Sequence, residues 1–115
     1  MILVSQIQRA VADHYGLSVA ELLSATRQRR IARPRQIGMY LARRHSACSL
    51  PDIARRFGLR NHTTALHAIR NVENLIGRDI ELWTDVESVE ARLALEADLC
   101  RLVVGQPKSF VAVAL

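Results

Sequence analysis

The sequence predicts an all-α protein of about six helices, with a central helix-turn-helix preceded by a basic loop. Apolar residues recur every three or four positions along most of the 115 residues, which is the period of an amphipathic helix. Half of the residues are hydrophobic and most of these are aliphatic, so a packed core can form. Residues that start and end helices separate the periodic stretches, and no alternating pattern typical of paired strands occurs.

Two helices are expected in the N-terminal quarter of the chain. The first ends at Gly16 and has an apolar stripe made of Ile2, Leu3, Ile7, Ala10, Val11 and His14. Ser18 and Glu21 have the spacing of a capping box, in which each side chain bonds the backbone N–H of the other residue. This box predicts a short second helix over residues 19 to about 25.

Residues 26–33 (TRQRRIAR) have little apolar periodicity and predict a basic connector. Pro34 suits the first turn of a third helix, because its missing N–H would have no partner there. The faces of this helix are expected to divide into an inward set, Ile37, Met39, Tyr40 and Leu41, and an outward set, Arg35, Arg43 and Arg44.

The next two helices form the predicted helix-turn-helix. The run SLPD from Ser49 starts a short helix that Gly58 ends, with Ile53, Ala54 and Phe57 on its buried face. Asn61 is a good N-cap for a longer helix to about Ile76, closed by Gly77. The inward residues of that helix are Leu66, Ile69, Val72, Leu75 and Ile76. Small Ala54 allows close helix packing and Gly58 a tight turn, here one or two residues longer than the commonest form.

Thr84 and Glu87 form a second capping-box pattern and predict a last helix that ends near Gly105, with Val86, Val89 and Leu93 on one stripe. Its acidic residues predict a solvated face: Glu87, Glu90, Glu96 and Asp98. We divide the chain into a helix-turn-helix domain over 1–97 and a helix extension with an apolar tail over 98–115. The tail either folds back on the core or contacts a second copy or another protein.

Several protein classes are not expected. The sequence has no GxxxxGK[ST] loop, no nucleophile in a recognisable catalytic setting and no apolar run that could span a bilayer. Cys48 and Cys100 lack metal-ligand spacing, and His62 and His67 lie on different helix faces. We therefore predict no enzyme activity, no cofactor, no metal site, no disulfide, no secretory signal and a cytoplasmic location.

The net charge of +5 hides a strongly basic centre. Residues 27–70 contain eleven arginines and one acid, Asp52, for a charge of +10, whereas both flanking segments are acidic. The planar guanidinium of arginine pairs bidentately with phosphate and with guanine edges. This layout favours a surface that faces nucleic acid. A solvated basic face, or a surface for acidic lipid or protein, is the other interpretation.

Short polar side chains begin the second helix of the helix-turn-helix: Asn61, His62, Thr63 and Thr64. In a major groove, threonine can contact a thymine methyl group, and asparagine or histidine can bond base-edge donors and acceptors. The alternative is purely structural, with Asn61 acting only as a cap and the threonines as ordinary first-turn residues.

Three runs carry a family resemblance: RPRQIGMYLAR (33–43), SLPDIARRFG (49–58) and RNHTTALHA (60–68). Together they resemble the C-terminal DNA-binding domain of the bacterial replication initiator DnaA, and the resemblance covers residues 3 to 97. In that family the recognition helix begins with D-H-T-T-V and reads an asymmetric TTATCCACA-type box. The resemblance implies double-stranded DNA as the partner, a role in regulating replication initiation or transcription, and a nucleoid-associated location.

The resemblance also implies roles for individual residues. Arg27 would enter the adjacent minor groove, where narrow A·T-rich DNA concentrates negative potential, or would contact phosphate alone. Arg29 would contact phosphate, and Gln36 would face the groove or orient Arg35. Leu50 and Pro51 would lie against the DNA backbone. The residues that would meet bases or nearby phosphates are Arg35, Arg43, His62, Thr63 and Thr64, and Arg60 and Asn61 complete the expected DNA-binding set.

Three departures from the family pattern matter. Asn61 stands where the family has aspartate, so a side chain that both donates and accepts replaces an acceptor. Ala65 replaces the family valine, and the ATPase module of the initiators is absent from these 115 residues. We expect either a regulator that competes with the full initiator for its boxes or the box-reading domain of an initiator. The alternative is a protein-interaction adaptor that uses the tail and the acidic last helix and keeps only residual DNA affinity.

Overall fold

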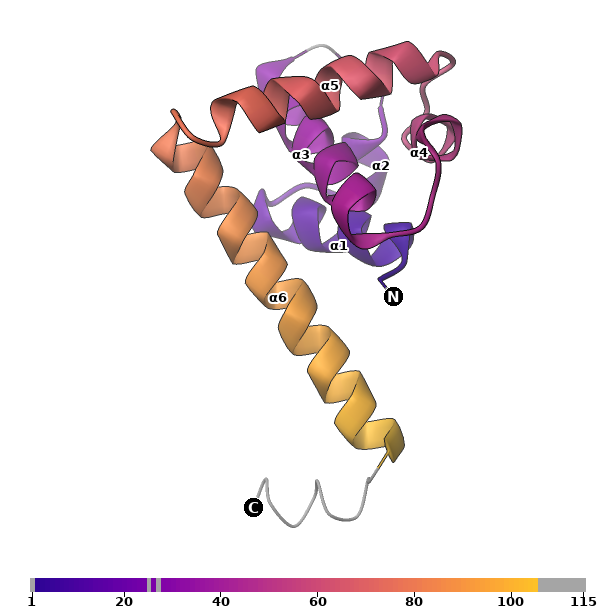
Figure 1. Ribbon diagram of the computed structural model, residues 1–115, viewed down its shortest axis with the longest axis vertical. Helices are drawn as coiled ribbons and strands as arrows, with labels where there is room; N and C mark the ends of the chain where they lie inside the picture. Colours follow the sequence, from indigo (N-terminus) through magenta and orange to yellow (C-terminus); the bar gives the residue numbers. More distant parts are fainter. Residues whose placement is uncertain (1, 25, 27, 106–115) are drawn as a thin grey trace.

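The computed structural model describes the backbone of residues 2–24, 26 and 28–105 and the side chains of these residues up to Glu96. The described residues form α1 (Val4–His14), α2 (Val19–Leu22), α3 (Arg29–His45), α4 (Leu50–Arg56), α5 (His62–Leu75) and α6 (Ile80–Gly105). Figure 1 shows α3 in the middle, with α1 on one side and α5 on the other. The predicted all-α fold with a helix-turn-helix is confirmed.

The core lies around α3, and all six helices contribute to it. Each aliphatic or aromatic side chain that is fully buried contributes roughly 1.5–3 kcal/mol to stability. The largest of these side chains are Phe57, Ile7, Leu22, Ile37, Met39, Leu41, Ile53 and Leu82. The inward residues predicted for the third and fourth helices are buried, whereas Leu3, predicted on the stripe of the first helix, is exposed.

Helix α3 begins at Arg29, five residues before the predicted start at Pro34. The prediction of a connector over 26–33 was therefore wrong for residues 29–33. Ile31 is buried one turn before Pro34, and the apolar stripe continues through the proline to Ile37. Burial of Ile31 and of the proline ring offsets the backbone hydrogen bond that an internal proline removes.

Helix α6 begins at Ile80, so the predicted start at Thr84 was also wrong. The Oδ1 atom of Asp79 accepts hydrogen bonds from the N–H groups of Glu81 (3.1 Å) and Leu82 (3.2 Å), which caps the helix. The hydroxyl of Thr84 donates to the carbonyl of Ile80 within the first turn. The buried stripe of α6 starts at Leu82, one turn before the position that the sequence pattern indicated.

The capping box of Ser18 and Glu21 is present, but α2 ends at Leu22 instead of near Ala25, which lies outside the described residues. The Ser24 hydroxyl donates to the carbonyl of Glu21 at 2.7 Å. Such a bond from a side chain to the backbone competes with the next helical turn. Among the described helices, none is long and apolar enough to cross a membrane.

Candidate nucleic-acid interface

Helices α4 and α5 form the helix-turn-helix and pack against each other and against α3. The turn between them spans residues 57–61, which confirms the expectation of a longer turn. Ala54 and Ala65 are both buried, so small side chains allow the two helices to approach closely. Gly58 has a φ of +75°, which favours glycine, and a Cβ there would lie 3.2 Å from the carbonyl oxygen of Leu23.

A second glycine fixes how the helix-turn-helix sits on the central helix. A Cβ atom on Gly38 of α3 would lie 2.9 Å from the ring of Phe57, and that ring is buried. The absence of a side chain at Gly38 therefore lets the end of α4 lie directly on α3. This contact sets the position from which α5 starts.

Helix α5 has one buried face and one polar face. Ala65, Ala68, Ile69 and Val72 are buried against the rest of the protein. At about 100° per residue, the opposite face is centred on Thr63, His67, Arg70 and Asn74, all of which are exposed. The sequence analysis missed the later part of this face, although the helical period alone could have found it. The four polar side chains at the start of α5 are all exposed: Asn61, His62, Thr63 and Thr64.

Asn61 caps α5, because its Oδ1 atom accepts a hydrogen bond from the N–H of Thr63 at 2.8 Å. The predicted N-cap role of Asn61 is therefore confirmed. The bond to Thr63 uses only the amide oxygen, so the amide nitrogen of this exposed residue keeps its capacity to donate.

The sequence predicts that Arg35 points outward, and the structure differs. Its guanidinium is partly buried and donates from Nη2 to the carbonyl of Thr26 at 2.7 Å and from Nη1 to the carbonyl of Ser24. Burial lowers the pKa of this guanidinium below its usual value. Arg35 therefore contacts the segment between α2 and α3. Arg27, the predicted minor-groove residue in that segment, lies outside the described residues.

A groove lies between α3 and α5 beside the start of α5. It has a volume of about 320 Å³, and Arg35, Gln36, Thr64, His67 and Asn71 supply its polar lining. The amide nitrogen of Asn71 donates to Oε1 of Gln36 at 3.0 Å, which links the two helices across this groove. Asn71 was not singled out in the sequence, since this contact joins residues 35 positions apart.

The other predicted DNA-binding residues lie in four places: the two ends of α3, the turn before α5 and the first turn of α4. Arg29 starts α3, Arg43 is near its end and Arg60 precedes α5, and all three are exposed. No ion pair holds any of these three arginines within the described part of the chain. Leu50, partly buried, and Pro51, exposed, form the first turn of α4 behind its cap Ser49.

Other basic residues of the central segment pair with α6 instead. Arg33 lies 3.5 Å from Asp79, and the ring of His45 lies 2.6 Å from Oε2 of Glu90. Arg44 also approaches Glu90, so the prediction of Glu90 on a solvated face was wrong. This pairing requires that α6 dock on α3, a contact that helical periodicity does not indicate.

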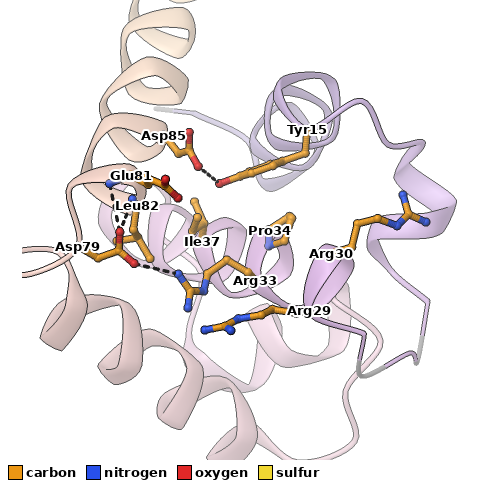
Figure 2. A pocket seen from close by; sticks show the side chains of 10 residues that line it. All are labelled: Tyr15, Arg29, Arg30, Arg33, Pro34, Ile37, Asp79, Glu81, Leu82 and Asp85. Atoms are coloured by element: carbon orange, nitrogen blue, oxygen red, sulfur yellow. Dashed lines mark hydrogen bonds and ion pairs between the residues drawn. The ribbon is translucent and has the colours of Figure 1, made fainter.

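Figure 2 shows the cavity where α1, α3 and α6 meet, which has a volume of about 600 Å³. The hydroxyl of Tyr15 donates to Asp85 at 2.7 Å, and burial together with this bond raises the pKa of Tyr15. On the facing wall, Arg33 points to Asp79. These two contacts hold the start of α6 against the end of α1 and against α3. Among the described residues, no three His, Cys, Asp or Glu side chains gather as a metal site would require.

Comparison with known proteins gives a consistent result. Residues 4–72 match a family model described as the bacterial dnaA protein helix-turn-helix. The chain is 50% identical over 92 residues to the chromosomal replication initiator protein DnaA of Caulobacter vibrioides (strain NA1000 / CB15N), which covers 80% of this chain and 19% of that protein. The DnaA protein of Bradyrhizobium sp. (strain ORS 278) is 49% identical over 90 residues, again with 19% of its length covered.

A solved structure agrees with these relatives. The crystal structure of a DNA replication initiation factor superposes with a TM-score of 0.66 at 35% identity, covering 78% of this chain and 29% of that one. The chain spans about a fifth of the length of the curated relatives that it matches. The matched part is a non-catalytic DNA-binding module. The chain therefore belongs to the bacterial DnaA helix-turn-helix family.

Proposed function

We propose that this chain binds double-stranded DNA at DnaA-box-like sites of the TTATCCACA type. The observation that carries the proposal is the exposed, polar first turn of α5 on a helix-turn-helix of this family. An α-helix fits the major groove, and its first turn is the part that contacts base edges in helix-turn-helix proteins. Thr63 and Thr64 would contact thymine methyl groups, and His62 would bond base edges.

Contacts to the DNA backbone would fix the register of α5 in the groove. Arg29, Arg43 and Arg60 are exposed and have no ion-pair partner within the described residues, so phosphates can recruit them. Leu50 and Pro51, at the start of α4, would lie against the backbone. Arg27, from the connector, would enter the minor groove next to the box.

Occupation of such boxes would regulate replication initiation or transcription. The relatives with this module are chromosomal replication initiator proteins, and a chain that reads the same box would compete with them for it. The competition would depend on the ratio of affinities for the box and for other DNA.

The proposal is tested by Thr63→Ala with Thr84→Ala as the matched control. Thr84 lies in α6, where its hydroxyl bonds the helix backbone. We expect Thr63→Ala to weaken binding to a labelled box duplex about 5- to 150-fold, as one lost base contact costs ~1–3 kcal/mol, and Thr84→Ala to leave it unchanged. Equal affinity of the two variants for the box, measured by fluorescence anisotropy, would contradict the assignment of Thr63 to base reading.

A second candidate function is a protein-interaction adaptor, and two exposed apolar side chains on α6 favour it. Ile80 is 72% exposed and Trp83 is 43% exposed, three residues apart on the same side of the helix. The double variant Arg27→Ala/Thr63→Ala separates the candidates. If the chain works by binding DNA, this variant would lose its binding to the box. If the chain works as an adaptor, the variant would still bind its protein partner.

A further inference from the structure

We propose that Arg35 is a positioning residue of the DNA interface, which holds the segment between α2 and α3 against α3 and does not itself contact DNA. The inference rests on the proposed function, because the segment it holds is the one expected to reach the minor groove. It revises the role that the family resemblance implied for Arg35, which was a contact to bases or nearby phosphates.

The geometry is that of a bridge between two backbone carbonyls. Nη2 of Arg35 donates to Thr26 at 2.7 Å and Nη1 donates to Ser24, so one rigid guanidinium binds two points of the segment. The segment also has an internal bond, from the N–H of Gln28 to the hydroxyl of Thr26 at 3.2 Å. These bonds tie the described residues Ser24, Thr26 and Gln28 to one another or to Arg35 of α3.

The bridge lies beside the part of α5 that would read DNA. Arg35 and Thr64 line the same groove between α3 and α5. The neighbouring residue on α3, Gln36, is bonded to Asn71 of α5 at 3.0 Å. The segment and the start of α5 are thereby fixed to one stretch of α3, so they would meet adjacent grooves of the duplex in a set register.

A phosphate contact by Arg35 would cost these bonds. Its guanidinium is partly buried, and turning it to a phosphate would leave the carbonyls of Ser24 and Thr26 without this donor. Arg43, on the same helix, is the contrasting case, because it is exposed and has no ion-pair partner within the described residues. The structure thus assigns different roles to Arg35 and Arg43, which lie on the same helix.

Because Arg35 already holds Ser24 and Thr26, DNA binding has less conformational entropy to remove from them. Having to fix the backbone of one more residue on binding corresponds to an affinity about 5- to 30-fold lower. Loss of the bridge should therefore weaken box binding at least about tenfold, with no phosphate contact removed. Arg35→Lys should behave like Arg35→Ala, since an ammonium cannot reproduce the planar bridge.

The experiment compares Arg35→Ala and Arg35→Lys with Arg43→Ala and Arg43→Lys in the full chain. Affinity for the TTATCCACA duplex is measured at several salt concentrations, and hydrogen exchange is measured for peptides covering residues 23–28. We expect both Arg35 variants to bind at least about tenfold more weakly with an unchanged salt slope, and to exchange faster over 23–28. Arg43→Ala should lower the slope by about one, Arg43→Lys should restore it, and neither should alter exchange.

Two results would overturn the inference. One is wild-type affinity for Arg35→Lys together with a slope lowered by about one in Arg35→Ala, which would make Arg35 a phosphate contact. The other is unchanged exchange over 23–28 in both Arg35 variants. Failure of the proposed function gives a different pattern, in which the wild-type chain binds box and scrambled duplexes equally while the exchange data still report on the bridge.

Discussion

At the scale of single residues, Asn61 joins the fold to the proposed reading of DNA. Its side-chain Oδ1 atom accepts a hydrogen bond from the N–H of Thr63 and thereby caps the start of α5. Its amide nitrogen can still donate, and in the proposed function a donor there would select acceptors on base edges, such as O4 of thymine or O6 and N7 of guanine. The aspartate of the family pattern would present an acceptor in the same place.

Two substitutions of Asn61 separate these roles. Asn61→Ala removes the cap and should lower the free energy of unfolding by about 1 kcal/mol, whereas Asn61→Asp keeps an oxygen for the Thr63 N–H and should retain stability. Urea denaturation measures both. On duplexes with single base changes, Asn61→Asp should favour bases that offer an amino group. An Asn61→Ala chain as stable as the wild type would contradict the capping role.

The sequence predicted the exposed, polar start of α5, but not the partners of the longer side chains of α3 and α6. Helical period and N-cap chemistry suffice for Asn61 and Thr63, because both effects are local. The partners of Arg35 and Glu90 lie on other elements, 9 to 45 residues away. Such contacts follow only from the packing of the helices.

At the scale of elements, α3 is the support for the interface. It contacts α1, α2, α4, α5 and α6, and a Cβ atom added at Gly38 would lie only 2.9 Å from the Phe57 ring. The starts of α3 and α6 could not be predicted, because Pro34 and Thr84 are local signals. Burial of Ile31 and Leu82 outweighs those signals, and this burial exists only in the assembled fold.

The close approach at Gly38 predicts a difference between two glycines. A methyl group at Gly38 would press on the buried Phe57 ring, and overpacking of this kind costs ~1–3 kcal/mol, more than the ~1 kcal/mol that alanine gains over glycine in a helix. We expect Gly38→Ala to lower the melting temperature. Gly77→Ala is the control, since no atom lies within 4 Å of a Cβ there, and it should not lower it. A stabilised Gly38→Ala chain would show that the ring has room to move.

At the scale of the whole molecule, the acidic side chains of α6 and the exposed arginines of the basic centre lie in different parts of the structure. The acidic α6 pairs with α1 through Asp85 with His14 and through Arg92 with Asp13. It pairs with α3 through Glu90 with His45. Arg29, Arg43 and Arg60 remain exposed for an anionic partner. The basic centre and acidic flanks read from the sequence indicated this separation. The pairing of α6 with the rest of the protein could not be read from the charges alone.

The docking of α6 should be separable from DNA binding. Asp85→Ala removes the acceptor for the half-buried Tyr15 hydroxyl and for His14, and should cost roughly 1–3 kcal/mol of stability. Affinity for box DNA should not change at a temperature where the variant is folded, because Asp85 lies on α6 and not at the start of α5 (Figure 1). Denaturation and anisotropy test the two halves, and a loss of DNA affinity by the folded variant would contradict this separation.

The most direct test of box recognition is fluorescence anisotropy with two labelled duplexes, one carrying TTATCCACA and one with the same bases scrambled, titrated at several salt concentrations. Several mismatched positions at ~1–3 kcal/mol each predict binding to the box that is about a hundredfold tighter or more at every salt concentration. The slope against salt would count the phosphate contacts. Equal, salt-sensitive binding to both duplexes would contradict sequence-specific reading and leave only a basic surface.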